Sequence, residues 1–409
     1  MRIASGEYAR VRKVNMLEGL KVVEHATYMA APGAGGVLAD WGADVIKIEP
    51  PGGDPIRQFF ASIGTDITDN PVFDFDNRGK KSVMLDASEE AGREAIRKLA
   101  DDADVFLTNV RPGGLQRSGL DYETLSKRNP KLVYCALTGY GLDGPDADRP
   151  GFDIASFWSR AGVARLTIPK HLPPFPLRTA QGDHTTSLAA VAAINAALLE
   201  RVKTGKGRLV DVSLLRTGLY TMGSDLAIQL FFGRVASTKP REEATNPLMN
   251  FFQTKDGVWL CVVPRQGNGD WAKIGRAFGA PHMIDDERFA TPKSRRAHTQ
   301  DLIAGLDAGC KQFTAKEFAE RLDAEQIAWA PVQTLADVVE DPQVIAAGGI
   351  VETPSADGDA FKAPASPARF HGADDGPKGP SPKPGEHTEE ILSGLGYSAA
   401  EIKSMRGEA

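Results

Sequence analysis

Residues 20–49 read LKVVEHATYMAAPGAGGVLADWGADVIKIE, with apolar runs on both sides of a segment of small residues. LKVVEHA (20–26) is typical of a buried strand, and ADVIKIE (43–49) predicts a second one. Between them, PGAGGVLADWG (32–42) predicts a helix with proline in its first turn. A helix that joins two apolar strands indicates a parallel pair. This stretch therefore predicts the start of a parallel α/β sheet.

The same alternation of strand and helix continues for about a hundred residues. Further strands are expected at 82–86, 104–110 and 131–141, with helices at 88–103 and 120–130. Segment 109–117 is glycine-rich and is expected to be a loop. Alternating elements of this kind favour a parallel sheet covered by helices.

The middle of the chain has a different pattern. NFFQTKDGVWLCVVP (250–264) predicts a β-hairpin around an Asp-Gly turn. A later helix is expected to begin at Thr314, because Glu317 completes a capping box. We expect a smaller α+β domain at about 225–335. Segment 355–387 is rich in Pro, Gly and Ala, so it must lie across another surface or stay mobile. A short helix is expected after it.

Composition limits the class of protein. The chain has 409 residues, 42% hydrophobic content and a formal net charge of −6. These values favour a two-domain globular protein and give no reason to expect affinity for nucleic acid or for an anionic membrane. The three cysteines are scattered, and neither a signal-peptide pattern nor a membrane-spanning apolar run is found in the sequence. We therefore expect a cytoplasmic protein with reduced thiols and no metal site.

The glycines of the first predicted helix partly match a dinucleotide-binding motif. Gly33, Gly35 and Gly36 follow Pro32, so they fall inside the helix, and Leu38 stands where the third glycine of G-x-G-x-x-G belongs. Glycines inside a helix more often permit close packing. NAD binding stays open as the weaker alternative.

Basic and polar side chains gather at the ends of the predicted strands. They are Arg78, Lys80 and Lys81 before one strand, Asn109, Arg111 and Arg117 after another, and Tyr140 after a third. Loops at strand ends of one parallel sheet can converge, and cations beside flexible backbone suit phosphate groups. These segments favour a nucleotide-bearing ligand.

One aspartate invites two interpretations. LRTAQGDHTTSLAAVAAIN (177–195) places Asp183 after a Gln-Gly break and before a long helical run. Aspartate is a preferred helix N-cap, so a purely structural role is the simpler interpretation. A carboxylate with an unperturbed pKa of about 4 is also ionised at neutral pH and is a nucleophile without a base. His184 is expected to line a pocket or the first turn.

Together these motifs resemble the family III CoA-transferases, the CaiB/BaiF group that includes formyl-CoA transferase. The resemblance is carried by AAPGAGGVLADWGADVIKIEPPGGD, NRGKKSVMLD, ADVFLTNVRPGGLQRSGLDYETL, NPKLVYCALTGYG, GDHTTSLAA and GEHTEEIL. It implies a CoA-transferase that moves CoA from an acyl-CoA donor to a carboxylic acid acceptor. It also implies a homodimer of interlocked subunits. Each would have a Rossmann-like large domain from 1–224 and 336–409 around a small domain at 225–335, with the return segment wrapping the partner.

The resemblance also implies roles for particular residues. Asp183 matches the nucleophile that forms an acyl anhydride and an aspartyl-CoA thioester. The implied CoA contacts are Tyr28, Met29, Ala30, Lys80, Asn109, Val110, Arg111, Arg117 and Tyr140. Thr138 stands where some members have a lysine beside the adenine. Gly267 and Gly269, in RQGNGDW (265–271), match part of a mobile glycine loop over the nucleophile.

Two other functions are alternatives. An α-methylacyl-CoA racemase needs an acid/base pair, and the position of its histidine is occupied by Phe152 in PGFDIASF, which cannot carry a proton. A non-catalytic acyl-CoA-binding protein is the second alternative. Phe152, Phe157, Trp158 and segment 171–177 fit either an apolar acyl pocket or ordinary core.

Overall fold

The structure, a computed structural model, describes residues 15–175, 178, 180–265, 267–355 and 358–407. The chain forms two compact units. Unit 1 contains the chain up to Ala164, Phe175–Val235 and the chain from Ile345 onward, and unit 2 contains Arg165–Pro174 and Ala236–Val344. The units change over slightly later in the chain than the predicted boundaries at 224 and 335, which stay predictions.

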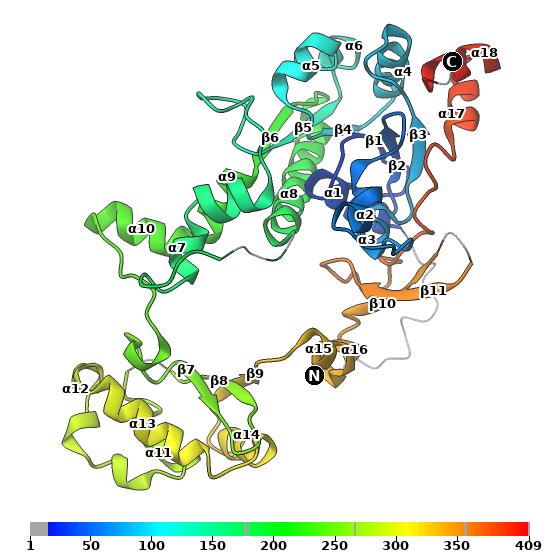
Figure 1. Ribbon diagram of the computed structural model, residues 1–409. Coiled ribbons are helices and arrows are strands. Elements are labelled where there is room, and N and C mark those ends of the chain that lie inside the picture. Colours follow the sequence, from blue (N-terminus) through cyan, green and yellow to red (C-terminus); the bar gives the residue numbers. More distant parts are fainter. Residues whose placement is uncertain (1–14, 176–177, 179, 266, 356–357, 408–409) are drawn as a thin grey trace. The chain divides into compact units, whose positions relative to one another are not determined.

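A six-stranded parallel sheet forms the centre of unit 1 (Figure 1). Its strands, in spatial order, are β3 (Lys81–Met84), β2 (Asp44–Glu49), β1 (Lys21–His25), β4 (Val105–Thr108), β5 (Val133–Thr138) and β6 (Leu209–Ser213). Val22 of β1 pairs with Val45 on one side and Val105 on the other. The expected parallel α/β sheet is confirmed. The order 3-2-1-4-5-6 places β1 and β4 at the point where the chain reverses direction across the sheet, which is where such sheets bind ligands.

Helices cover both faces of this sheet. On one face, Val22 and Val105 pack with α1 (Ala30–Asp40) and α8 (Gln181–Thr204). On the other, Val23 and Phe106 belong to a second core cluster. The helices of that cluster are α4 (Glu90–Asp101), α5 (Pro112–Ser118), α6 (Tyr122–Arg128), α17 (Thr388–Gly394) and α18 (Ala399–Met405). Because neighbouring residues of a strand face opposite sides, both faces are apolar, as a doubly covered parallel sheet requires.

Other elements of unit 1 surround the sheet. They are η2 (Pro55–Gln58), α2 (Phe59–Ser62), α3 (Pro71–Asn77), η3 (Ile154–Arg160), α9 (Leu214–Thr221), α10 (Gly223–Phe232), and the hairpin of β10 (Ile350–Pro354) and β11 (Ala360–Pro364). Two helices, α7 (Val163–Thr167) and α16 (Pro342–Ala346), lie where the chain passes between the units.

The prediction of a glycine-rich loop at 109–117, after β4, is wrong in part. Residues Pro112–Ser118 form α5, which begins with proline at its first position and ends at Gly119, a left-handed residue with φ 63°. Proline is pre-organised for the first helical turn and glycine for the residue after the last, so these two residues bracket the helix. The helix is not predicted from the sequence because Gly113 and Gly114 are also typical of a loop.

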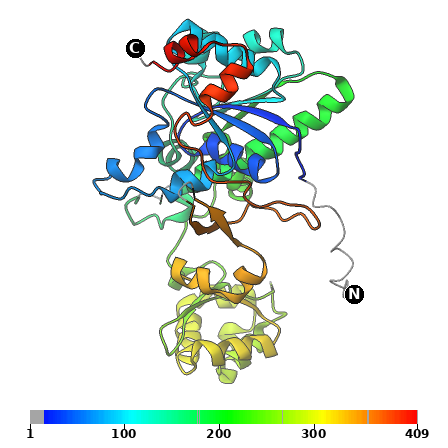
Figure 2. The same cartoon turned by 90° about the vertical axis from the view of Figure 1, so that its right-hand side faces the viewer.

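The C-terminal part of the chain returns to the edge of the sheet (Figure 2). The backbone N–H of His387 donates to Ser82 O at 2.9 Å, and the Thr388 hydroxyl accepts from Met84 N at 2.9 Å. These contacts place α17 beside β3. The region after residue 355 therefore lies across another surface for part of its length, one of the two outcomes expected.

Unit 2 is built on an antiparallel sheet of β7 (Asn250–Gln253), β8 (Trp259–Val263) and β9 (Ala328–Pro331). Its helical elements are η4 (Arg241–Glu243), α11 (Trp271–Ala277), η5 (Pro281–Met283), η6 (Glu287–Phe289), α12 (Pro292–Ala297), α13 (Thr299–Cys310), α14 (Ala315–Ala324) and α15 (Leu335–Glu340). The predicted hairpin and the capping box of Thr314 and Glu317 are confirmed. Among the described helices of either unit, none combines the length and apolar character needed to cross a membrane.

Candidate active site

Helix α1 lies very close to its neighbours because its first turns contain glycines. A Cβ atom on Gly33 would lie 2.7 Å from Ser187 Oγ of α8, and one on Gly36 would lie 2.7 Å from Asp76 O of α3. A Cβ on Gly35 would overlap the buried Glu24 carboxylate. The interpretation that these glycines permit close packing is therefore confirmed. This packing brings the starts of α1 and α8 together, and Ser187 Oγ donates to Ala30 O at 2.6 Å.

Asp183 lies in the first turn of α8, but it is not the helix cap. The N-cap is Ala180, with a left-handed φ of 74°, and Asp183 is the third helical residue. Gln181 and Gly182 are helical too, so the predicted interruption of regular structure before Asp183 is wrong. A Cβ at Gly182 would lie 2.5 Å from Cγ of Phe157, and the Gly182 N–H donates to Asp153 Oδ2 at 3.2 Å. Glycine is needed here for the close approach of Phe157 and Asp153.

The surroundings of Asp183 oppose its ionisation. Burial, followed by the negative charge of Asp153, raises the pKa of Asp183 to about 7. Burial also raises the pKa of Asp153, whose side chain is 5% exposed. The prediction of an unperturbed, fully ionised carboxylate is therefore wrong. Strongly shifted carboxyl groups of this kind are concentrated at functional sites.

His184 and Asp76 form a polar pair beside Asp183. His184 Nε2 lies 3.1 Å from Asp76 Oδ1, and Asp76 is 3% exposed. Burial by itself lowers the pKa of His184, but the hydrogen bond to Asp76 and the nearby carboxylates outweigh it, and the net pKa is raised. A protonated His184 in turn lowers the pKa of Asp183. Sequence reasoning missed Asp76 and Asp153, because their distances from Asp183 along the chain match no periodic pattern.

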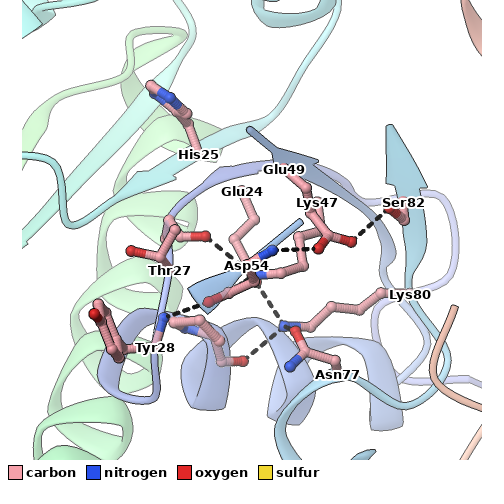
Figure 3. Close-up of polar contacts among 12 residues, drawn as sticks. Glu24, His25, Thr27, Tyr28, Lys47, Glu49, Asp54, Asn77, Lys80 and Ser82 are labelled. Carbon is pink, nitrogen blue, oxygen red and sulfur yellow. Dashed lines mark hydrogen bonds and ion pairs between the residues drawn. The ribbon is translucent and has the colours of Figure 1, made fainter. Parts of the chain in front are cut away.

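The predicted CoA loop follows β1 and is fixed by side chains from other segments. Asn109, after β4, holds Thr27 on both sides: its Oδ1 accepts from Thr27 N at 3.1 Å and its Nδ2 donates to Thr27 O at 2.6 Å. Tyr28 has a left-handed φ of 64°, and its N–H donates to Asp54 Oδ1 at 3.1 Å (Figure 3). Tyr28 is 42% exposed, and Met29 is buried. A strained loop held in this way at a strand end suits a binding site.

Lys80 belongs to a buried ion network next to this loop (Figure 3). Its ammonium contacts three acceptors: Glu24 Oε2 at 2.7 Å, Pro32 O at 2.8 Å and Asn77 Oδ1 at 2.9 Å. Lys47 lies 3.0 Å from the other oxygen of Glu24. Three acceptors satisfy all three donors of an ammonium group. The contact of Lys80 with CoA stays a prediction, and it would require these bonds to be exchanged.

The other two basic residues of segment 77–82 are also paired. Arg78 is buried and forms an ion pair with Asp40 at 2.6 Å, and Lys81 lies 3.0 Å from Asp44. These cations are therefore paired in this structure, and the hypothesis that segment 77–82 meets phosphate groups stays a prediction.

Cations beyond β4 and β5 are more accessible. Arg111 and Arg117 are exposed, at the start and in the last turn of α5. Val110 and Tyr140 are half-buried, and the Arg160 guanidinium lies 4.9 Å from the centre of the Tyr140 ring. Their CoA contacts stay predictions.

The glycine loop belongs to unit 2. Gly267 and Gly269 are exposed, and Gly267 O accepts from Arg295 Nη2 at 2.9 Å. Gln266 lies outside the described residues. Movement of this loop stays a prediction.

A cavity of about 660 Å³ opens beside the start of α8. Apolar side chains supply most of its wall, including Met29, Phe59, Phe75 and Leu188, and His184 and Asp76 add polar groups. Phe157 and Trp158 are buried and do not line this cavity, so core packing is the better interpretation for these two residues. Within the described residues, no group of three or more His, Cys, Asp or Glu side chains is placed to hold a metal ion.

Sequence comparison agrees with this architecture. The profile of CoA-transferase family III matches residues 17–388, so the chain belongs to this family. It is 32% identical to (R)-2-hydroxy-4-methylpentanoate CoA-transferase of Clostridioides difficile, over 96% of this chain and 98% of that protein. It is 31% identical to succinate–glutarate CoA-transferase of Agrobacterium fabrum, over 93% and 95%.

Comparison of structures gives the same result. A CaiB/BaiF family protein from Brucella suis superposes with a TM-score of 0.81 at 34% identity, over 94% of this chain and all of that one. The protein is therefore an enzyme of CoA-transferase family III, a family that uses acyl-CoA and carboxylic acid substrates. The alternative of a non-catalytic binding protein is not supported.

Proposed function

We propose that this enzyme exchanges CoA between an acyl-CoA and a carboxylic acid by covalent catalysis at Asp183. The observation that carries the proposal is the position of Asp183, which is half-buried in the first turn of α8. Ser187 Oγ of the same helix donates to Ala30 O at 2.6 Å and to Asp183 O at 3.0 Å, so this turn lies against the start of α1. The start of a helix favours negative charge, which supports both the carboxylate and a developing oxyanion. Restricted access to water protects an anhydride from hydrolysis.

The steps of the exchange balance without a cofactor other than CoA itself. A carboxylate oxygen of Asp183 attacks the thioester carbonyl, the C–S bond breaks, and an anhydride and CoA thiolate form. The thiolate attacks the aspartyl carbonyl, the donor acid leaves as carboxylate, and an aspartyl-CoA thioester remains. The acceptor carboxylate attacks this thioester and releases thiolate, giving a second anhydride. The thiolate then attacks the acyl carbonyl of that anhydride, which forms the new acyl-CoA and restores Asp183 with one oxygen from the acceptor.

The CoA site would be built at the carboxyl ends of β1, β4 and β5. Tyr28, Met29 and Ala30 would approach the pantetheine, with Asn109 and Val110 beside them. Arg111 and Arg117, which are exposed, would face the phosphates. The half-buried ring of Tyr140 would lie against the adenine. Bidentate contacts with phosphate suit arginine. Arg111→Ala should raise the KM for acyl-CoA and leave kcat nearly unchanged.

The test of the covalent step uses heavy oxygen. Multiple turnovers with an ¹⁸O-labelled acceptor acid should place label in the Asp183 carboxylate, detected by peptide mass spectrometry. Asp183→Ala should abolish exchange and retain CoA affinity, while Asp66→Ala, at an exposed site, should behave like the parent. Normal turnover by Asp183→Ala, or an unlabelled Asp183 after many cycles, would refute the mechanism.

Exposed apolar side chains on α9 and α10 support a homodimer. Tyr220, Leu230, Phe231 and Phe232 are each at least 67% exposed, and α10 contains no buried residue. Apolar surface of this size is rarely left in water by a monomer. Phe231→Asp should therefore convert a dimer into monomers in light scattering, whereas a parent protein that is monomeric at micromolar concentration would contradict this part of the proposal.

A further inference from the structure

We propose that the cavity beside α8 binds the side chain of the acid, and that the acid is a monocarboxylate with a bulky apolar body, either branched aliphatic or aryl. The inference rests on the proposed function and deepens it, because it names the substrate class.

The cavity lies beside the first turns of α8, which contain Asp183, although the Asp183 side chain is not part of its wall. Its wall includes Ala180, the N-cap of α8, and the helix residues His184, Ser187 and Leu188. Asp183 precedes Ser187 by four residues, so the two are neighbours on the helix surface, and the Ser187 hydroxyl donates to Asp183 O at 3.0 Å. Met29, from the predicted CoA loop, lines the cavity as well. An acyl group attached to Asp183 therefore has this cavity as adjacent space within unit 1.

The size and the wall suit a large apolar group. The volume of about 660 Å³ lies within the common range for small-molecule sites, and an apolar cavity of about 150 Å³ already holds benzene. Phe59, Val72, Phe75 and Leu188 supply apolar surface from three helices or their flanks. Acetate or formate would leave most of this space unfilled.

The charged groups of the wall argue against a second carboxylate on the acid. Among the described residues that line the cavity, the basic ones are Arg78 and His184. Arg78 donates to Asp40 through Nε at 3.1 Å and Nη2 at 2.6 Å, and its Nη1 donates to Thr353 Oγ1 at 3.2 Å and Pro364 O at 3.1 Å. His184 is paired with Asp76.

Each cation on the wall thus already has an anionic partner. A second carboxylate would enter a mostly apolar cavity and meet Asp40 and Asp76 without an unpaired cation, at a large desolvation cost. An uncharged acyl body carries no second charge, so its binding does not meet this desolvation cost.

The experiment is a matrix of donors and acceptors. The acids 4-methylpentanoate, 3-phenylpropanoate, glutarate and acetate, and their CoA thioesters, are paired in every combination, and products are measured by mass spectrometry. We expect kcat/KM for the first two acids to exceed the values for glutarate and acetate by about 100-fold or more. Equal or better use of glutarate would overturn the inference while leaving the proposed function intact. Failure of every pair, with no label on Asp183, would instead refute the proposed function.

Two variants of α8 locate the effect in the cavity. Leu188→Arg introduces an unpaired cation into the wall, so the ratio of glutarate to 4-methylpentanoate use should rise at least about tenfold. Leu199→Arg, on the same helix but 64% exposed, should leave that ratio unchanged. Equal shifts in both variants, or none in Leu188→Arg, would overturn the inference. Thermal unfolding of both variants distinguishes a changed preference from misfolding.

Discussion

Replacing Asp183 by asparagine should inactivate the enzyme and at the same time stabilise it at alkaline pH. The folded protein raises the pKa of Asp183 from 3.8 to about 7, first by burial and then by the charge of Asp153. Because the folded state holds its proton more tightly than the unfolded state, stability falls as pH rises from about 4 to 7. The full cost of the charged carboxylate above pH 7 is about 4 kcal/mol. Asparagine cannot ionise and avoids this cost.

The difference between variant and parent should depend on pH. At pH 5 only the first part of the cost is present, so the stability advantage of Asp183→Asn should grow by about 2.5 kcal/mol between pH 5 and pH 8. Denaturant unfolding at both pH values, at one fixed protein concentration, measures this difference. Asp66→Asn, at an exposed site, is the control for loss of one carboxylate. An advantage that is the same at pH 5 and pH 8 would refute the raised pKa and the electrostatic account of the site.

Three further outcomes follow from the same contacts. In the parent, kcat/KM should rise with pH to a plateau, with a midpoint near the Asp183 pKa of about 7. Asp153→Asn should move this midpoint to lower pH, because it removes a like charge beside Asp183. A pH–rate profile that is the same in Asp153→Asn and the parent would contradict this. His184→Gln removes a group whose positive charge lowers the Asp183 pKa, so the midpoint of the same profile should move to higher pH. Asn109→Ala removes both hydrogen bonds to Thr27, so the KM for acyl-CoA should rise several-fold with kcat almost unchanged, measured by steady-state kinetics.

Local patterns were sufficient for much of the fold. The apolar runs around residues 20–49 predicted β1, α1 and β2, and the capping box at Thr314 predicted the start of α14. Such signals lie within a few residues of one another, because strand period, helix period and capping are short-range properties. The glycines of α1 were also interpreted correctly, although the groups they approach could not be named. The helix at Pro112–Ser118 was not predicted, because adjacent glycines are also typical of a loop.

The sequence by itself determined the strand–helix alternation, the family, and Asp183 as the candidate nucleophile. Only the tertiary structure decided the pKa of that residue, because burial sets the cost of ionisation and Asp153 and Asp76 reach it from other segments. It also decided that Lys80 and Arg78 are paired inside the protein, with partners 56 and 38 residues away in the chain. A side chain's chemistry is written in the sequence, but its pKa and its free donors depend on neighbours that only folding brings within a few ångströms.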